Sequence, residues 1–438
     1  MCQSFAPVRL LRRRLHLLAL LSSTILGILY FGRLHLLSYY IHDEELETTA
    51  ATRPHVIHAP SQTPANGVSD GHILTAGEIT TFLAHIPGKT ETQLPTVGCP
   101  DFDSQRYSSL QAKSAGLHYF FALDLRKCLP ILPQLLRGII AAIEFLGTTS
   151  CVLSIVEGNS DDGTHDLLSS LRSEMDFRGI QYFLHASSID TSHGDRIGKL
   201  ADLRNLALEP LLQGRNQLKP SSEAEVVFLN DVALCPDDIL ELLLQRRRLN
   251  ATMTCAMDWH FAGQEPTFYD VWVTRGINGD TFFDIPTNGS WDLALNLLWN
   301  ADEDIRSRFR SHRPFPVFSC WNGAVVFKTD VVLEHGVRFR SSNAEVGECF
   351  QGEPQLFCKD LWFRGLGKVA VVPSVNLEYS VERGRRIKEV KGFTAELVAS
   401  QKGGGTDAIK WPPPPETVKC MPTWQDQSWR PWNETLAW

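Results

Sequence analysis

The sequence has no excess of basic residues, no cysteine pairs of the zinc-binding kind and no visible internal repeat. Its formal net charge is −8, which argues against nucleic acid as the main partner because phosphate backbones require a basic surface. It contains no CxxC pair and no Cys/His spacing suited to zinc. Its 438 residues, 43% apolar and 21% charged, are typical of a globular protein with one large or two medium domains.

Formal charge is also missing from residues 15–32, and this absence indicates a membrane segment. At about 1.5 Å per residue, a helix of this length just crosses a hydrocarbon core of roughly 30 Å. Residues 1–14 carry four arginines and no acid, which predicts a cytoplasmic N-terminus and a luminal bulk. No convincing small-x-small cleavage site follows, so an uncleaved signal-anchor is favoured over a cleaved signal peptide. We expect a single-pass type II membrane protein.

The composition divides the chain into five parts. They are a cytoplasmic tail (1–14), a signal-anchor (15–32), a luminal stem (33–98), a catalytic domain (99–400) and a Pro/Trp-rich C-terminal tail (401–438). The stem is rich in Thr, Pro, His and Ala and shows little periodicity. Within it, the apolar segment ITTFLAHI is a candidate to pack on the domain.

Nine of the ten cysteines lie beyond the apolar segment, which fits an oxidising lumen. Some of them should be paired, and the odd number leaves at least one free thiol or an intermolecular bond. Cys151 and Cys255 lie in apolar runs and could simply be buried thiols. The connectivity stays open.

From about Gln111 the pattern is that of an α/β protein. Helices are expected over 129–147, 162–175, 196–212 and 237–247, and strands over 151–158, 180–186, 226–231 and 252–259. This alternation predicts right-handed crossovers and a mainly parallel sheet flanked by helices. Ligands of such sheets bind at the carboxyl ends of the strands. The second half is less regular and contains long aromatic loops, which are typical of functional segments.

Polar side chains follow the strand 151–158 in the turn EGNSDDGT. Acidic and amide groups on a strand-to-helix turn can hold the hydroxyls and base of a nucleotide. The alternative is an ordinary turn that caps a helix. The residues concerned are Glu157, Asn159, Asp161 and Asp162.

A second polar group lies in RIGKLADLRN, on the helix expected over 196–212. Cations at one end of a helix that faces the cleft suit a diphosphate. The alternative is a solvated helix face, the commoner place for Arg and Lys. The residues concerned are Arg196, Lys199, Arg204 and Asn205.

The third group is Asn230 and Asp231, which end the apolar run VVFL. An aspartate at a strand end can ligate a hard divalent cation that neutralises a departing phosphate. The alternative, a cap for the next helix, is weakened because Asp237 can supply that cap. Three such groups at one edge of a sheet predict a nucleotide site more strongly than any one of them.

These segments resemble known enzymes. VEGNSDDGT, KLADLRNLAL and FLNDVALCPDDILELL are similar to the nucleotide turn, the Arg-Asn helix and the DxD segment of GT-A glycosyltransferases. The closer resemblance is to the fungal capsule-associated protein and α-1,3-mannosyltransferase family. It rests on FLNDVALCPDDILEL, CAMDWHF, FYDVWVTRGINGDTF, FSCWNGAVVF and ECF followed by DLW, roughly within residues 110–390. The resemblance implies one GT-A-like, Rossmann-type luminal domain.

The family implies a Golgi type II membrane enzyme that transfers mannose from GDP-mannose with retention, using Mn²⁺ (or Mg²⁺). The acceptor would be a mannose-containing glycan of a capsule, a cell wall or a glycoprotein. Asp231 corresponds to the second aspartate of DxD and would bind the metal. Leu229 takes the first acidic position, which leaves one protein carboxylate or a weak site. Asn230, Arg196, Lys199, Arg204, Asn205, Glu157, Asn159, Asp161 and Asp162 would contact the donor.

The acceptor side must come from the second half of the chain. Trp321, Asn322 and Gly323 resemble the loop that packs a sugar ring on an aromatic face, although a core tryptophan beside a turn fits equally. Asp258, Asp270, Glu348 and Asp360 are candidate cleft carboxylates. Asp360 and Glu348 are preferred as catalytic residues, with Asp258 next. Front-face retention and double displacement through a carboxylate both stay open.

Three alternatives remain at this stage. The donor could be another sugar nucleotide such as UDP-xylose, since no residue specifies the base or sugar. A non-catalytic family member could act as a scaffold in polysaccharide assembly or export, because Asp231 stands alone. A lectin-like luminal module would explain the aromatic loops but not the charged groups at the strand ends.

Overall fold

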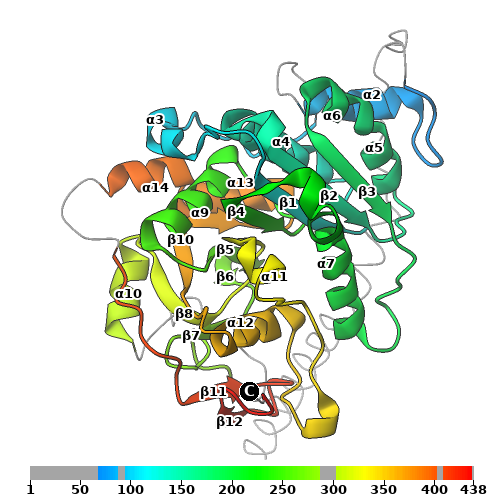
Figure 1. Ribbon diagram of the computed structural model, residues 1–438. Helices are drawn as coiled ribbons and strands as arrows, with labels where there is room; N and C mark the ends of the chain where they lie inside the picture. Colours follow the sequence, from blue (N-terminus) through cyan, green and yellow to red (C-terminus); the bar gives the residue numbers. More distant parts are fainter. Residues whose placement is uncertain (1–67, 87–93, 287–301, 402–407, 437–438) are drawn as a thin grey trace, which may run out of the picture. The chain divides into compact units, whose positions relative to one another are not determined.

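The computed structural model describes residues 68–86, 94–286, 302–401 and 408–436 (Figure 1). The predicted cytoplasmic tail, the predicted signal-anchor 15–32 and most of the predicted stem lie outside these residues. Within them, no helix is long and apolar enough to cross a membrane.

The described part of the chain is built on a mixed sheet in the order β3-β2-β1-β4-β9-β5-β10-β8-β7, with β6 paired to β5. The first four strands of this order are parallel to one another. Their bounds are β1 Leu117–Leu125, β2 Cys151–Glu157, β3 Gln181–Ala186 and β4 Pro220–Leu229. This half has the alternating βα pattern that the sequence predicts.

The other half of the sheet departs from the mainly parallel sheet expected. β9 pairs antiparallel with both β4 and β5, and only β5 and β10 are parallel there. The expectation holds for the parallel core, where a helix follows each strand, and not for this half. The bounds are β5 Met253–Ala262, β6 Glu265–Phe268, β7 Arg275–Gly276, β8 Phe315–Ser319, β9 Ala324–Lys328 and β10 Val369–Leu377.

Helices cover both faces of the sheet (Figure 1). Along β1, Phe121 and Leu123 belong to the core beneath α2 (Ala76–His85), α4 (Leu132–Leu146), α5 (Thr164–Ser170) and α9 (Pro236–Leu249). Phe120 and Ala122 belong to a second core, which includes residues of α7 (Arg196–Gln213) and α12 (Glu353–Phe363). This alternation is the period of a strand buried on both faces.

The remaining elements are short or lie at the periphery. They are α3 Ser104–Tyr107, η1 Ser108–Leu110, η2 Thr148–Ser150, α6 Arg172–Arg178, α8 Arg215–Leu218, α10 Glu303–Arg310, α11 Asp330–Leu333, η4 Ala344–Val346, α13 Val381–Lys391, α14 Thr394–Ser400, β11 Thr417–Cys420 and β12 Ser428–Pro431.

Three expected helices need correction at their ends. The helix predicted over 162–175 is divided at Leu171 into α5 and α6. Pro210 does not close α7, which continues to Gln213. Helix α9 begins at Pro236, and its capping carboxylate is Asp238 rather than Asp237, because Asp238 accepts the Cys235 N–H at 2.7 Å.

Part of the predicted stem packs against the domain, as proposed for ITTFLAHI. Helix α2 places Ile79, fully buried, in the core beneath α4 and α5. The carboxylate of Asp166 accepts the backbone N–H groups of His72, Ile73 and Leu74 at 2.6–3.0 Å. The compact body therefore begins before residue 99.

Among the described residues, three disulfides form, Cys99–Cys235, Cys255–Cys320 and Cys349–Cys420. Cys255 is thus paired rather than a buried thiol. Cys151 is a buried thiol, as are Cys128 and Cys358.

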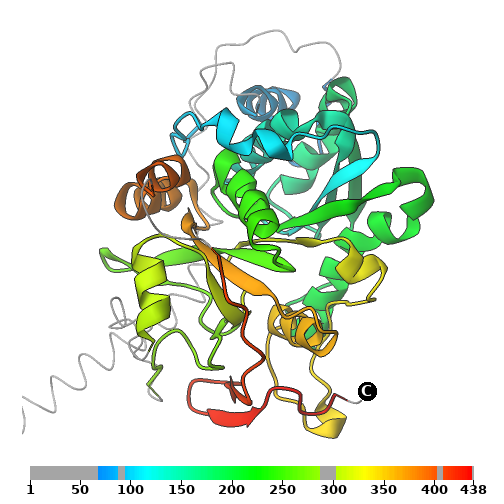
Figure 2. The same ribbon diagram turned by 60° about the vertical axis from the view of Figure 1, so that its left-hand side comes forward.

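The C-terminal segment 408–436 is tied to the antiparallel half of the sheet. Trp272 donates its indole N–H to the Met421 carbonyl at 2.7 Å, and Arg275 donates to the Lys419 carbonyl at 2.8 Å. Figure 2 shows this red segment running past the yellow and orange elements to the hairpin β11–β12. The segment is therefore part of the folded body.

Candidate active site

The carboxyl ends of β1 and β4 bring Asp124 beside Asn230 and Asp231. The two strands are parallel with Leu123 opposite Leu229, so the residues that follow lie at the same edge of the sheet. Asp231 is half-buried and forms no ion pair with another described residue. It therefore has a carboxylate that a ligand can use.

Arg204 lies beneath this edge and is buried rather than open to a ligand. Its Nε donates to Glu353 Oε1 at 2.8 Å, and its Nη1 lies 4.0 Å from Asp124 Oδ1. Its guanidinium also stacks 4.5 Å from the ring centre of Trp321. Arg204 was predicted to contact the donor. In the structure its guanidinium instead contacts two carboxylates and an aromatic ring of the protein.

Trp321, Asn322 and Gly323 connect the start of β9 to the end of β4. The Trp321 indole N–H donates to Asn230 Oδ1 at 3.0 Å, and the Asn230 N–H donates to the Gly323 carbonyl at 2.9 Å. Asn322, fully buried, donates from Nδ2 to the Ala256 carbonyl at 2.8 Å. Trp321, only 2% exposed, and Gly323 thus position Asn230. The predicted role of the three residues in acceptor binding stays a prediction.

A second carboxylate pair, Asp258 and Asp270, lies between β5 and the loop that follows β6. Asp258 is fully buried, and its Oδ2 accepts the Tyr379 hydroxyl at 2.6 Å. Asp270 Oδ2 accepts the Asn322 N–H at 3.0 Å. The exposed side chain of Tyr269 contacts the Tyr379 ring, with 4.9 Å between ring centres. Asp258, predicted from the sequence, is therefore brought close to Asp270.

Burial disfavours the ionised form of the carboxyl groups in this region. Desolvation, with repulsion from Asp124, raises the pKa of Asp231 to about 6, although Arg204 opposes the shift. Desolvation likewise raises the pKa of Asp124 to about 6 against the attraction of Arg204. Desolvation, then repulsion from Asp270, raises the pKa of Asp258. Such a group of carboxylates favours a bound cation or proton.

The described side chains alone do not form a complete metal site. Within the described residues, no three His, Cys, Asp or Glu side chains converge as ligands of one ion. The fit rests on Asp231, whose repulsion from Asp124 a divalent cation would relieve. Oxygen atoms of a ligand would have to complete the coordination, as expected for Mg²⁺ or Mn²⁺ bound through one or two carboxylates.

In the predicted nucleotide-binding turn, acidic side chains accept hydrogen bonds from the turn's own backbone. Glu157 Oε1 accepts the Ser160 N–H at 2.8 Å. Asp162 accepts the N–H groups of Thr164 and Leu129, both at 3.0 Å, so it joins the turn to the loop after β1. Asn159 and Asp161 are exposed on this turn, and Asp161 pairs with Lys127 at 3.1 Å.

The four predicted donor contacts on α7 differ in exposure: Arg196 is exposed, Arg204 is buried, and Lys199 and Asn205 are half-buried. Arg196 and Lys199 lie in its first turn, where Arg196 is exposed and Lys199 bonds to the His193 carbonyl. Asn205 instead uses both amide atoms on the backbone of Phe339, at 2.9 and 3.1 Å. With Arg204 also engaged, Arg196 is the one of these four side chains that is exposed to solvent.

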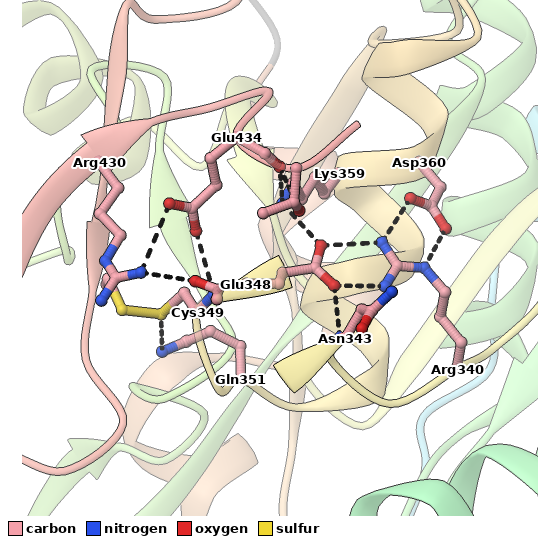
Figure 3. A network of polar contacts seen from close by, with 12 residues as sticks. Arg340, Asn343, Glu348, Cys349, Gln351, Lys359, Asp360, Arg430 and Glu434 are labelled. Carbon is pink, nitrogen blue, oxygen red and sulfur yellow. Dashed lines mark hydrogen bonds and ion pairs between the residues drawn. A yellow bond between two sulfur atoms is a disulfide. The ribbon is translucent and has the colours of Figure 1, made fainter. Parts of the chain in front are cut away.

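Glu348 and Asp360, the preferred catalytic carboxylates, lie in a separate ionic network (Figure 3). Arg340 donates to Glu348 at 2.7 and 3.1 Å and to Asp360 at 2.8 and 2.9 Å. Lys359 adds a bond to Glu348 at 2.7 Å. Desolvation is outweighed by these bonds, which lower the pKa of Glu348 to about 2. Their geometry is that of a structural clamp, and their catalytic role stays a prediction.

Sequence reasoning missed four residues of this site, Asp124, Glu353, Tyr269 and Tyr379. Asp124 had a usable signal, because the apolar run FFAL ends in an aspartate as VVFL does in Asn230 and Asp231. The sequence contains no such signal for Tyr379, because Tyr379 contacts Asp258 only in the folded chain.

The family described as Cryptococcal mannosyltransferase 1 matches residues 118–360. This range includes both carboxylate pairs and most of the sheet. The alpha-1,3-mannosyltransferase CMT1 of Cryptococcus neoformans var. neoformans is 36% identical over 355 residues, covering 75% of each chain.

Solved structures give weaker likenesses. S. aureus TarS residues 1–349 in complex with UDP has a TM-score of 0.36 and 11% identity, over 66% of this chain and 68% of that one. The mannosyltransferase PcManGT from Pyrobaculum calidifontis in complex with GDP-Man and Mn²⁺ has a TM-score of 0.34 and 11% identity, over 69% and 71%.

Proposed function

Because the chain belongs to the Cryptococcal mannosyltransferase 1 family and is a glycosyltransferase, we propose that it transfers mannose from GDP-mannose to a mannose-containing glycan. We propose an α-1,3 linkage, on the printed activity of the relative that is 36% identical, and retention of configuration. The observation that carries the proposal is Asp231, a half-buried carboxylate at the end of β4 beside Asp124 that pairs with no cation among the described residues.

Asp231 would hold the divalent cation, Mn²⁺ or Mg²⁺. Such a cation, when bound, neutralises charge on the departing diphosphate. Arg196 is exposed at the start of α7 and close enough to Tyr269 to affect its ionisation, so it can add positive charge at the same opening. Asn230 is held in place by Trp321 and Gly323, which fixes the backbone next to the metal ligand.

The surroundings of Asp258 and Asp270 favour front-face retention over double displacement. A nucleophilic carboxylate must present an oxygen to the anomeric carbon. Asp258 is fully buried with one oxygen bonded to Tyr379, and Asp270 accepts the Asn322 N–H. We therefore propose that the departing diphosphate takes the proton of the acceptor hydroxyl, while the two aspartates shape the cleft.

We further propose that the chain is a Golgi type II membrane protein anchored by residues 15–32. The support is the uncharged segment after a basic N-terminus. Protection of the body from protease in sealed Golgi vesicles, and its loss on adding detergent, would support this topology. Digestion in sealed vesicles would contradict it.

The test is release of GDP from GDP-mannose by the purified full-length chain, with mannobiose as acceptor and with Mn²⁺ or EDTA. We expect metal-dependent release and an α-1,3-linked product by NMR. Asp231→Asn should abolish both, whereas Asp202→Asn, an exposed aspartate on α7, should match the wild type.

Other outcomes would select the alternatives. Turnover of UDP-xylose but not of GDP-mannose would identify UDP-xylose as the donor. Binding of mannobiose without turnover of either donor would indicate a lectin-like module. If the chain neither turns over a donor nor binds sugar, the scaffold in polysaccharide assembly or export is the alternative that remains.

A further inference from the structure

Tyr269 is an aromatic side chain that the fold leaves in the open beside buried carboxylates. It is 49% exposed, although it lies next to the fully buried Asp258 and the half-buried Asp270. Its ring contacts Tyr379 at 4.9 Å and the edge of His260 at 5.7 Å, between ring centres. An exposed aromatic ring supported from behind is a flat surface that a ligand can cover.

The surface lies at the proposed active site. Desolvation of the hydroxyl, together with Asp258, Asp270 and Asp231, raises the pKa of Tyr269 to about 12, while Arg196 opposes the shift. Hydrogen bonds connect the same region: Asp270, the residue after Tyr269, accepts the Asn322 N–H at 3.0 Å, and Gly323 accepts the Asn230 N–H at 2.9 Å. The ring is thus linked to the residue that precedes the proposed metal ligand.

The orientation of the ring is fixed by two sets of bonds. The Tyr269 N–H donates to the Asp258 carbonyl at 3.1 Å, and its own carbonyl accepts the Val271 N–H at 2.8 Å. Tyr379, against which the ring packs, donates its hydroxyl to Asp258 Oδ2 at 2.6 Å. A ring held at both its backbone and its rear face loses little freedom when a ligand binds.

We propose that the exposed ring of Tyr269 is the platform on which the acceptor sugar stacks, with Tyr379 as its positioning residue. This inference rests on the proposed transfer to a mannose-containing glycan. A pyranose has an apolar C–H face that packs on an aromatic ring, while its hydroxyls stay free for polar partners. The acceptor hydroxyl would then face the donor held at Asp231.

Tyr269 meets this requirement better than Trp321. Trp321 is only 2% exposed, and the guanidinium of Arg204 lies over its ring. A sugar could not reach it without displacing a buried ion pair.

The test compares Tyr269→Ala and Tyr269→Phe with the wild type, all as full-length chains. The control is Phe183→Ala, a side chain 39% exposed on the terminal strand β3. The measurements are KM for mannobiose, KM for GDP-mannose, and GDP release without acceptor. We expect Tyr269→Ala to raise the acceptor KM about tenfold. The donor KM and acceptor-free GDP release should stay at wild-type values.

The phenylalanine variant isolates the ring. Tyr269→Phe should restore the acceptor KM, because stacking needs the ring and not the hydroxyl, and Phe183→Ala should match the wild type. An unchanged acceptor KM in an active Tyr269→Ala overturns the platform alone. An equal rise in donor KM, or a phenylalanine variant as weak as alanine, also overturns it. A wild type that transfers no mannose refutes the proposed function, and the platform with it.

Discussion

Replacing Arg204 by methionine tests whether its guanidinium serves the fold or the donor. In the structure it pairs with Glu353, 3% exposed, and stacks on Trp321 at 4.5 Å. Arg204→Met keeps an unbranched apolar stem and removes the guanidinium, with its charge and its N–H donors. Glu353 would then be a buried carboxylate without its partner.

The expected cost follows from that unpaired carboxylate. Breaking a buried ion pair by removing one partner costs about 3–5 kcal/mol, and losing the stack on Trp321 adds about 1 kcal/mol. Since whole domains are stable by about 5–15 kcal/mol, the melting temperature should fall by on the order of 5 °C or more. The double variant Arg204→Met/Glu353→Gln should recover part of the loss, with a coupling energy of about 2 kcal/mol.

Urea unfolding followed by tryptophan fluorescence measures these values, and steady-state kinetics measures the donor KM. The matched control is Arg196→Met, an exposed arginine on the same helix. We expect it to keep wild-type stability and to raise the donor KM. The reasoning is refuted if Arg204→Met unfolds at the wild-type urea concentration while its donor KM rises more than about tenfold.

Three further results are expected. The pKa values of Asp124 and Asp231 are raised from 3.8 to about 6. The stability that these two groups contribute is therefore fully present below about pH 3.8 and is lost as the pH rises through about 6. Melting temperature should therefore rise from pH 7 to pH 5, while Mn²⁺-dependent GDP release should fall; parallel changes would contradict this. Glu348→Gln and Asp360→Asn should lower melting temperature with little effect on turnover, and a loss of about 10²-fold or more would restore their predicted catalytic role. Cys349→Ser should cost about 2–5 kcal/mol by opening its disulfide, and no change in denaturation midpoint would contradict that.

Local sequence patterns were sufficient for three of the four strands in the parallel half of the sheet. Strands β2, β3 and β4 and the helices between them follow from short apolar runs and helical periodicity. The same patterns placed Asp231 at a strand end. They missed β1, because the run FFAL leads into LDLRKC without a turn signal.

Contacts between distant residues explain the rest of what was missed. In the basic segment 383–391, Lys388 is buried and pairs with Asp238 at 2.7 Å. That partner is 150 residues away, so periodicity alone could not identify it. Likewise, the partner that occupies both Glu348 and Asp360 is Arg340, and only the fold shows that one guanidinium lies between them.

The insertion of antiparallel β9 between β4 and β5 accounts for the proposed division of the site. Neighbouring strands lie about 4.8 Å apart, so the ends of β4 and β5 are separated by roughly 10 Å. Asp231 follows β4, whereas Asp258 on β5 supports the Tyr379–Tyr269 pair. Asn322 and Gly323, which precede β9, lie between these two strand ends, where Gly323 bonds to Asn230 and Asn322 to Ala256. The loop before β9 therefore holds the proposed donor side at Asp231 apart from the proposed acceptor side at Tyr269.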